Sequence, residues 1–200
     1  MSNFEAIIFD YGGVIANKVF TIYDVFKALN IEFPKNQNSE LEEILISYEK
    51  GIPNEEFKQS LKEKLNLELP ENFFETWKKI HNEKTGKDCA VLEIIKKLKS
   101  KNYKLAMLSN VNKIYGEENY KNGTYDIFDV LILSYEVGMI KPEPDIYKLT
   151  LEKLGLPGDR CIFIDDRIEN LEPAKRLGIH TIHFKDAKAL EDELKKLNIL

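Results

Sequence analysis

The sequence is poor in arginine, cysteine and histidine, and it has no long apolar run. Only three of its 29 basic residues are arginine, and the net charge of the 200 residues is −5. Nucleic-acid affinity comes mainly from neutralising phosphates, so an acidic, arginine-poor chain is a poor candidate for nucleic-acid binding. Two cysteines are too few for a disulfide scaffold. The sequence contains no window of about 18 uncharged apolar residues, so we expect no membrane span.

The amino terminus also lacks the basic region and apolar stretch of a signal peptide. We therefore expect a cytoplasmic protein with reduced thiols, and by default a monomer. Apolar residues make up 43% of the chain and charged residues 32%, which is ordinary for a folded globular protein. A length of 200 residues is typical of one domain, or of one domain that carries an insertion.

Short apolar runs that end in polar residues recur along the chain. Four of them are typical of buried parallel strands, and a fifth, with more alternation, suits the edge of a sheet. In chain order the five runs cover residues 4–10, 103–109, 130–134, 161–165 and 180–184. Amphipathic helical patterns at 91–98, 146–154 and 168–177 lie between them. Strands that alternate with helices predict an α/β fold with a doubly wound parallel sheet.

Residues 17–85 do not follow this alternation, because they show helical patterns and no convincing strand. The signals are an amphipathic segment at 22–29, a capping-box pattern at Ser39, and helix starts at Pro53 and Pro70. Four helices in about 70 residues predict a small bundle. We therefore expect an α/β core of residues 1–16 and 86–200, with an inserted helical cap of residues 17–85 placed to cover a site after the first strand.

Polar residues stand at the ends of the predicted strands, which is where ligands bind in open parallel sheets. They are Asp10, Ser109, Asn110, Asp165 and Asp166, and Lys141 follows in a loop after the third strand. Converging carboxylates repel one another unless a cation lies among them, and oxygen ligands favour Mg²⁺. A lysine and a hydroxyl beside Mg²⁺ make a phosphate site, in which an aspartate can attack phosphorus.

Taken singly, these residues also have structural explanations. Asp10 before two glycines can start a turn, the Ser109-Asn110 pair can cap the next helix, and Asp166 with Glu169 matches a capping box. Asp165 has no such explanation, because adjacent carboxylates at a strand end are costly without a cation. The combination, in this order and at these strand ends, predicts a functional site.

The sequence resembles the haloacid dehalogenase superfamily of phosphohydrolases, in the subfamily with a small helical cap after the first strand. The segments that carry the resemblance are IIFDYGGVI from residue 7, LSN from 108, GMIKP from 138 and IFIDD from 162. The resemblance implies an enzyme that hydrolyses a small phosphorylated metabolite through an aspartyl-phosphate, with Mg²⁺ as its cofactor.

The resemblance also implies a role for each strand-end residue. Asp10 is the expected nucleophile and a Mg²⁺ ligand, and the backbone carbonyl of Gly12 is a second ligand. Asp166 is the expected direct carboxylate ligand, with Asp165 close by or acting through water. Ser109 and Asn110 are expected to hold the phosphoryl oxygens, while Lys141 neutralises charge between the nucleophile and the phosphate.

Gly12 departs from the pattern of that superfamily. Most of its phosphatases have an aspartate there, which protonates the leaving group and then activates water, and losing a general acid–base costs about 10² to 10⁴ in rate. We therefore expect a slow or specialised phosphatase. A sugar 1-phosphate fits, because an anomeric oxygen leaves more readily than an ordinary alkoxide. The sequence also resembles a sugar-1-phosphate phosphatase branch that has glycine at this position.

Two alternatives remain open at this point. One is a binding or partner module without turnover. The other is a 2-haloacid dehalogenase, although Tyr11 stands one position too early for that pattern and the Asp165-Asp166 pair implies a cation that dehalogenases do not need. In the predicted cap, His81 is the one histidine expected to reach substrate. The absence of arginine there favours a small neutral leaving group such as a sugar.

Overall fold

A five-stranded parallel sheet forms the centre of the molecule. The computed structural model describes residues 3–18, 20–33 and 37–200. The strands are β1 (Ala6–Phe9), β2 (Lys104–Ser109), β3 (Val130–Leu133), β4 (Cys161–Asp165) and β5 (His180–His183). They lie in the order β3-β2-β1-β4-β5 and all pairs are parallel. The predicted doubly wound sheet is confirmed, with β1 at its centre and β5 at an edge.

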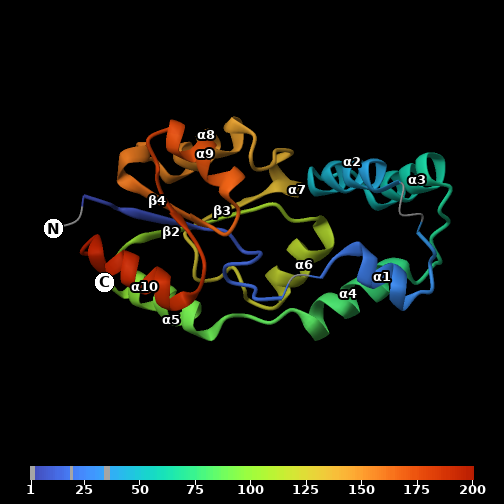
Figure 1. The fold of residues 1–200 in the computed structure, drawn as a ribbon, viewed down its shortest axis with the longest axis horizontal. Coiled ribbons are helices and arrows are strands. Elements are labelled where there is room, and N and C mark those ends of the chain that lie inside the picture. Colours follow the sequence, from blue (N-terminus) through green and yellow to red (C-terminus); the bar gives the residue numbers. More distant parts are fainter. Residues whose placement is uncertain (1–2, 19, 34–36) are drawn as a thin grey trace.

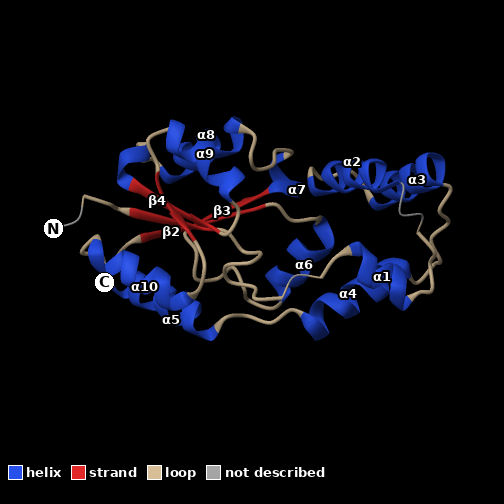
Figure 2. Cartoon of the chain, in the orientation of Figure 1, coloured by secondary structure: helices blue, strands red, loops and turns tan. Residues whose placement is uncertain are grey.

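Helices cover both faces of this sheet. Helices α8 (Pro144–Leu154) and α9 (Ile168–Arg176) lie on one face, and α5 (Cys89–Ser100) and α10 (Ala187–Lys196) lie on the other, as Figures 1 and 2 show. Alternate side chains of β1 enter the two apolar layers: Ile7 and Phe9 join one cluster, and Ala6 and Ile8 join the other. Burial on both faces explains why the strands are continuous apolar runs rather than alternating ones.

Four helices precede α5 and build an apolar cluster of their own. They are α1 (Ile22–Ala28), α2 (Asn38–Glu49), α3 (Asn54–Leu65) and α4 (Phe73–Lys84). Helix α2 contacts α3 and helix α1 contacts α4 (Figure 1). Aromatic side chains fill the cluster, with Tyr48, Phe57, Phe73 and Trp77 almost fully buried. The four helical segments expected from the sequence are confirmed.

The predicted capping box at Ser39 is wrong. Helix α2 begins one residue earlier, at Asn38, so Ser39 lies inside its first turn. The Ser39 hydroxyl donates to the adjacent Glu40 carboxylate instead of accepting the N–H of Glu42. A side chain that is already inside the helix cannot cap it, because its own backbone is helical.

Two helices that follow sheet strands contact helices of the α1–α4 cluster. Helix α6 (Lys113–Lys121) contacts α4, and its Ile114 belongs to the apolar cluster of the four helices. The one-turn helix α7 (Ser134–Val137) contacts α2. Among the residues that the structure describes, no helix is both long and apolar enough to cross a membrane.

Candidate active site

The sheet order brings the ends of three strands together. Strand β1 lies between β2 and β4, with Phe9 level with Met107 on one side and with Ile164 on the other. Asp10 directly follows β1, Ser109 ends β2 and Asp165 ends β4. The structure therefore places these three predicted residues together at the carboxyl end of the sheet, where their side chains are buried.

Lys141 lies between two of the carboxylates. Its Nζ is 2.7 Å from Oδ1 of Asp10 and 2.7 Å from Oδ2 of Asp165, and the whole residue is only 3% exposed. Burial alone would lower the pKa of Lys141, but the two carboxylates hold it above its usual value. Burial raises the pKa of Asp10 to about 6, against the opposing effect of Lys141. Lys141 is therefore the cation that makes the buried Asp10–Asp165 pair tolerable.

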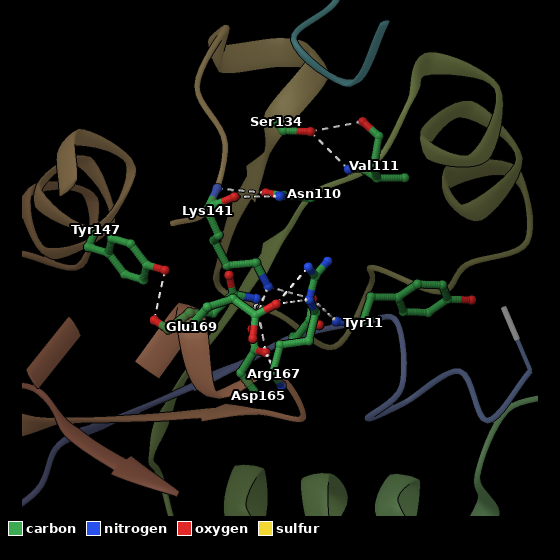
Figure 3. Close-up of polar contacts among 11 residues, drawn as sticks. Tyr11, Asn110, Val111, Ser134, Lys141, Tyr147, Asp165, Arg167 and Glu169 are labelled. Carbon is green, nitrogen blue, oxygen red and sulfur yellow. Dashed lines mark hydrogen bonds and ion pairs between the residues drawn. The ribbon is translucent and has the colours of Figure 1, made fainter. Parts of the chain in front are cut away.

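The side chain of Asn110 holds the backbone of Lys141. Its Nδ2 donates to the Lys141 carbonyl at 2.8 Å, and its Oδ1 accepts from the Lys141 N–H at 2.8 Å. Figure 3 shows the Lys141 side chain running from this pair of bonds toward Asp165. Asn110 does not cap the next helix, since Asn112 does so by accepting from Tyr115. Positioning Lys141 is a role for Asn110 that the sequence did not indicate, and its contact with phosphate stays a prediction.

The local sequence offered a structural explanation for Asp166 and none for Asp165, and the structure shows the reverse. Asp165 is fully buried, and it accepts hydrogen bonds from Lys141, from the Arg167 N–H at 2.8 Å and from Asn170 at 3.0 Å. The capping box expected between Asp166 and Glu169 does not form, because α9 starts after Arg167 and the Glu169 carboxylate pairs with the Arg167 guanidinium. Asp165 is thus explained by its neighbours, whereas Asp166 is not.

Asp166 keeps a free, buried carboxylate oxygen. Its Oδ1 is one of three buried side-chain atoms that find no hydrogen-bond partner within the described residues. The carboxylate lies against Gly13, where a Cβ would overlap it, and Gly13 has a positive φ of 77°. Burial and the charge of Asp165 raise the pKa of Asp166. Unpartnered carboxylate oxygens are unusual in protein interiors, so this one points to a cation.

The three aspartates fit a single divalent ion. One oxygen from each of Asp10, Asp165 and Asp166 lies within 4.8 Å of the others. Oxygens bound to one Mg²⁺ at about 2.0 to 2.1 Å lie roughly 3 to 4 Å apart, so this spacing requires little adjustment. Asp10 and Asp166 are the better placed ligands, because Asp165 already accepts from three donors.

A cavity of about 220 Å³ lies between the residues that follow β1 and end β2 and the helices α1, α2 and α4. Gly12, Ser109 and Asn110 contribute one wall. Much of the rest is apolar, including Ile22, Leu45, Trp77 and Val111. The cavity suits a small molecule with an apolar or weakly polar body.

A model of the haloacid dehalogenase-like hydrolases matches residues 7–184. The chain belongs to this family. A "Phosphorylated carbohydrates phosphatase" from Thermotoga maritima is 27% identical over 197 residues, which cover 93% of this chain and 89% of that protein. The bifunctional epoxide hydrolase 2 of Rattus norvegicus is 46% identical over 70 residues, or 35% of this chain and 13% of that one.

Solved structures of the same family share the whole architecture. A haloacid dehalogenase (HAD) family enzyme from Bacteroides thetaiotaomicron, in complex with magnesium and inorganic phosphate, superposes with a TM-score of 0.75 and 28% identity. The match covers 94% of this chain and 98% of that one. A predicted HAD-like hydrolase from Porphyromonas gingivalis has a TM-score of 0.77 at 22% identity, which indicates a shared fold.

The structure also places Gly12 and the neighbouring Tyr11 of this haloacid dehalogenase-like hydrolase. Gly12 lines the cavity. Tyr11 donates its backbone N–H to Asp10 Oδ1, but its phenol is directed away from the cluster and donates to Asn119, as Figure 3 shows for the ring. The phenol of Tyr11 therefore does not stand in for the side chain that Gly12 lacks.

His81 borders the cavity, as expected for the one histidine near substrate. It is 3% exposed, its Nε2 is 3.3 Å from Asn119 Oδ1 and its Nδ1 is 3.1 Å from Thr85 Oγ1. Its ring stacks on Tyr115 with centroids 4.1 Å apart. Burial lowers the pKa of His81, which keeps the ring neutral. Both ring nitrogens are engaged, so His81 shapes the cavity wall.

Sequence reasoning missed Glu49, the last residue of α2, which also lines the cavity. An acidic residue at the end of an amphipathic helix in a lysine- and glutamate-rich region is usually a solvated surface group. The one local signal is Gly51, whose positive φ of 98° turns the chain immediately after the helix.

Proposed function

We propose that this chain is a Mg²⁺-dependent phosphatase that hydrolyses small phosphorylated metabolites through an aspartyl-phosphate. The observation that carries this proposal is the position of Lys141, bonded to Asp10 and Asp165 next to the free oxygen of Asp166. A buried lysine beside carboxylates that can hold Mg²⁺ is the electrostatic arrangement that a transferring phosphoryl group requires. The magnesium and phosphate bound by the related Bacteroides enzyme support the same assignment.

In this proposal each side chain has one task. Asp10 is the nucleophile, Lys141 balances charge between it and the phosphoryl group, and Ser109 with the Asn110 backbone holds phosphoryl oxygens. Asp10, Asp166 and the Gly12 carbonyl would bind Mg²⁺, and Asp165 would orient Lys141. Bound there, Mg²⁺ would neutralise the phosphate charge and align the ester for attack.

We further propose that residues 17–85 form a cap domain over a core of residues 1–16 and 86–200. The separate apolar cluster of α1 to α4 supports this division. The described residues that line the cavity between the two parts are largely apolar, with Lys18 as the cation and no arginine, which favours an uncharged leaving group such as a sugar, for example from a sugar 1-phosphate. The name of the Thermotoga relative, a phosphatase of phosphorylated carbohydrates, agrees with this substrate class.

The test is phosphate release from p-nitrophenyl phosphate, glucose 1-phosphate and glucose 6-phosphate, with Mg²⁺ and after its removal by a chelator. We expect Mg²⁺-dependent turnover that Asp10→Asn abolishes. Wild-type protein that releases no more phosphate than Asp10→Asn from any of the esters would refute the proposal.

A further inference from the structure

One carboxylate of the cavity has no assigned task. Among the lining residues that the structure describes, Glu49 is the only acidic one, and it lies on the helical side of the same cavity that Gly12, Ser109 and Asn110 line from the strand ends. Within the described part of the chain its side chain makes no hydrogen bond and no ion pair. A partly buried carboxylate without a partner is costly unless it has a use.

The end of α2 is fixed against the α/β core. Lys50, the next residue, pairs through Nζ with Glu143 Oε1 at 2.6 Å. The backbone of Gly51 then packs directly on the carbonyl of Tyr135 in α7, where a Cβ would overlap that oxygen. These contacts hold the Glu49 backbone in place, and they join α2 to the loop that carries Lys141.

The surroundings of Glu49 favour a proton on its carboxylate near neutral pH. Burial raises the pKa of Glu49 to about 7, with Arg167 and Lys141 opposing the rise and Asp10 adding to it. The other charged or titratable side chains along the same cavity are Lys18, His81, Tyr11 and Tyr115. The charge of Asp10 raises the pKa of Glu49, so the two carboxylates are near enough to interact electrostatically.

We propose that Glu49 is the general acid and base that this chain uses in place of a side chain at position 12. This inference rests on the proposed phosphatase function. It assigns the proton transfers to the helical insertion, across the cavity from Gly12.

The proton balance closes over the two half-reactions. In the first, an Asp10 carboxylate oxygen bonds to phosphorus, the bond from phosphorus to the ester oxygen breaks, and that oxygen keeps the electron pair and takes the proton of Glu49. In the second, the Glu49 carboxylate takes a proton from water as the water oxygen bonds to phosphorus. The bond from phosphorus to Asp10 breaks, which returns a free Asp10 carboxylate, a protonated Glu49 and inorganic phosphate.

His81 is the other titratable candidate on the cavity wall, and it is less suited to this task. Both of its ring nitrogens already have partners, Asn119 and Thr85, and its lowered pKa leaves it neutral. Delivering a proton would break a buried hydrogen bond, whereas Glu49 has none to break.

The experiment compares Glu49→Gln with Glu42→Gln on esters of two kinds. Glu42 lies on the exposed side of the same helix, so its variant makes the same charge change away from the cavity. p-Nitrophenol leaves as a stable anion and needs no proton, whereas the sugar alkoxide of glucose 6-phosphate or glucose 1-phosphate does. We expect Glu49→Gln to lose about 10² to 10⁴ in kcat on the sugar esters and much less in the p-nitrophenyl phosphate burst. Glu42→Gln should match the wild type on both.

A pH profile adds a second readout. Wild-type kcat/KM on a sugar ester, which reports the first half-reaction, should fall as pH rises and Glu49 loses its proton, and Glu49→Gln should lack that limb. Glu49→Asp, which keeps the acid on a shorter arm, should retain an intermediate rate.

Three results would overturn the inference: a loss in the p-nitrophenyl phosphate burst as large as the loss on sugar esters, a rise in KM with unchanged kcat, or an unchanged pH limb. The first two identify Glu49 as a structural or binding residue in an active phosphatase. If wild-type protein hydrolyses neither ester, the proposed function itself fails, and this inference fails with it.

Discussion

The side-chain amide of Asn110 and the backbone of Lys141 exchange two hydrogen bonds of 2.8 Å, one in each direction. The first bond uses the carbonyl of Lys141 and the second its N–H, so the amide fixes the peptide on both sides of the lysine. This pair sets where the lysine side chain starts, and therefore where its ammonium meets Asp10.

Asn110→Ala removes both bonds. Because two partly buried backbone groups lose their partner, we expect the free energy of unfolding to fall by about 1 to 3 kcal/mol, and kcat to fall more than the affinity for substrate. Chemical denaturation and steady-state kinetics measure the two effects. Asp88→Ala is the matched control, because it removes the cap of α5 at a similar cost in stability and breaks no contact with Lys141. An Asn110→Ala enzyme with wild-type kcat would contradict the positioning role.

Gly13→Ala should abolish Mg²⁺ binding. A methyl group there would occupy the place of the Asp166 carboxylate, and the positive φ of Gly13 adds about 1 to 2 kcal/mol of backbone strain. Gly155→Ala is the control, since Gly155 also has a positive φ, of 67°, and a Cβ there would meet nothing within 4 Å. The readout is the rise in Tm on adding Mg²⁺, which Gly155→Ala should keep and Gly13→Ala should lose. Equal rises in both variants would argue against Asp166 as a ligand.

Glu49→Gln should change how stability depends on pH. A carboxylate whose pKa is raised from 4.5 to about 7 binds more protons in the folded than in the unfolded state between those values. The free energy of unfolding of the wild type therefore falls as pH rises through that window, because Glu49 loses its proton later in the folded than in the unfolded state. Glu49→Gln removes the penalty, so relative to the wild type it should gain about 1 to 3 kcal/mol between pH 4 and pH 8, after allowance for partial exposure. Urea titrations across that range measure the gain, and Glu42→Gln should show none. A difference in the free energy of unfolding between Glu49→Gln and the wild type that does not change with pH would show that Glu49 is an ordinary solvated carboxylate.

Gly12→Asp should rescue Glu49→Gln. An aspartate at position 12 would face the cavity beside Asp10, so it can supply the proton that the glutamine cannot. We expect the double variant to recover about tenfold or more of the kcat lost on sugar esters, with little change in the p-nitrophenyl phosphate burst. In the wild-type background the same substitution should have a smaller effect, because Glu49 already supplies the proton. A folded double variant no faster than Glu49→Gln would show that the missing group is not a proton donor.

The fold could be predicted from the sequence because its strands and helices have different hydrophobic periods. The runs ending at Asp10, Ser109 and Asp165 are apolar throughout, as strands covered on both faces must be. The meeting of their ends also followed, because parallel strands present their carboxyl ends at one edge. The positions of Asp10, Ser109 and Asp165 could therefore be predicted from the sequence.

The partners of individual side chains could not be predicted in this way. The Asp166–Glu169 and Ser39–Glu42 spacings match a capping box, but helix starts shift by one or two residues, and a capping side chain works at only one of them. The pairing of Lys141 with Asp165 joins residues 24 positions apart and depends on the path of a loop. Glu49 was missed because a surface helix and a helix that borders a cavity have the same amphipathic pattern.

The two sides of the cavity are joined to the core by chemically different contacts. Helix α2 is linked through the half-buried Lys50–Glu143 ion pair and the packing of Gly51 on Tyr135, whereas α4 is linked through aromatic packing of Trp77 and His81 on α6. Salt screens the first kind of contact and leaves the second nearly unaffected. Raising the ionic strength should thus weaken the Lys50–Glu143 contact of α2 and leave the contact of α4 with α6 nearly unchanged, while the packing of Gly51 on Tyr135 still holds the end of α2.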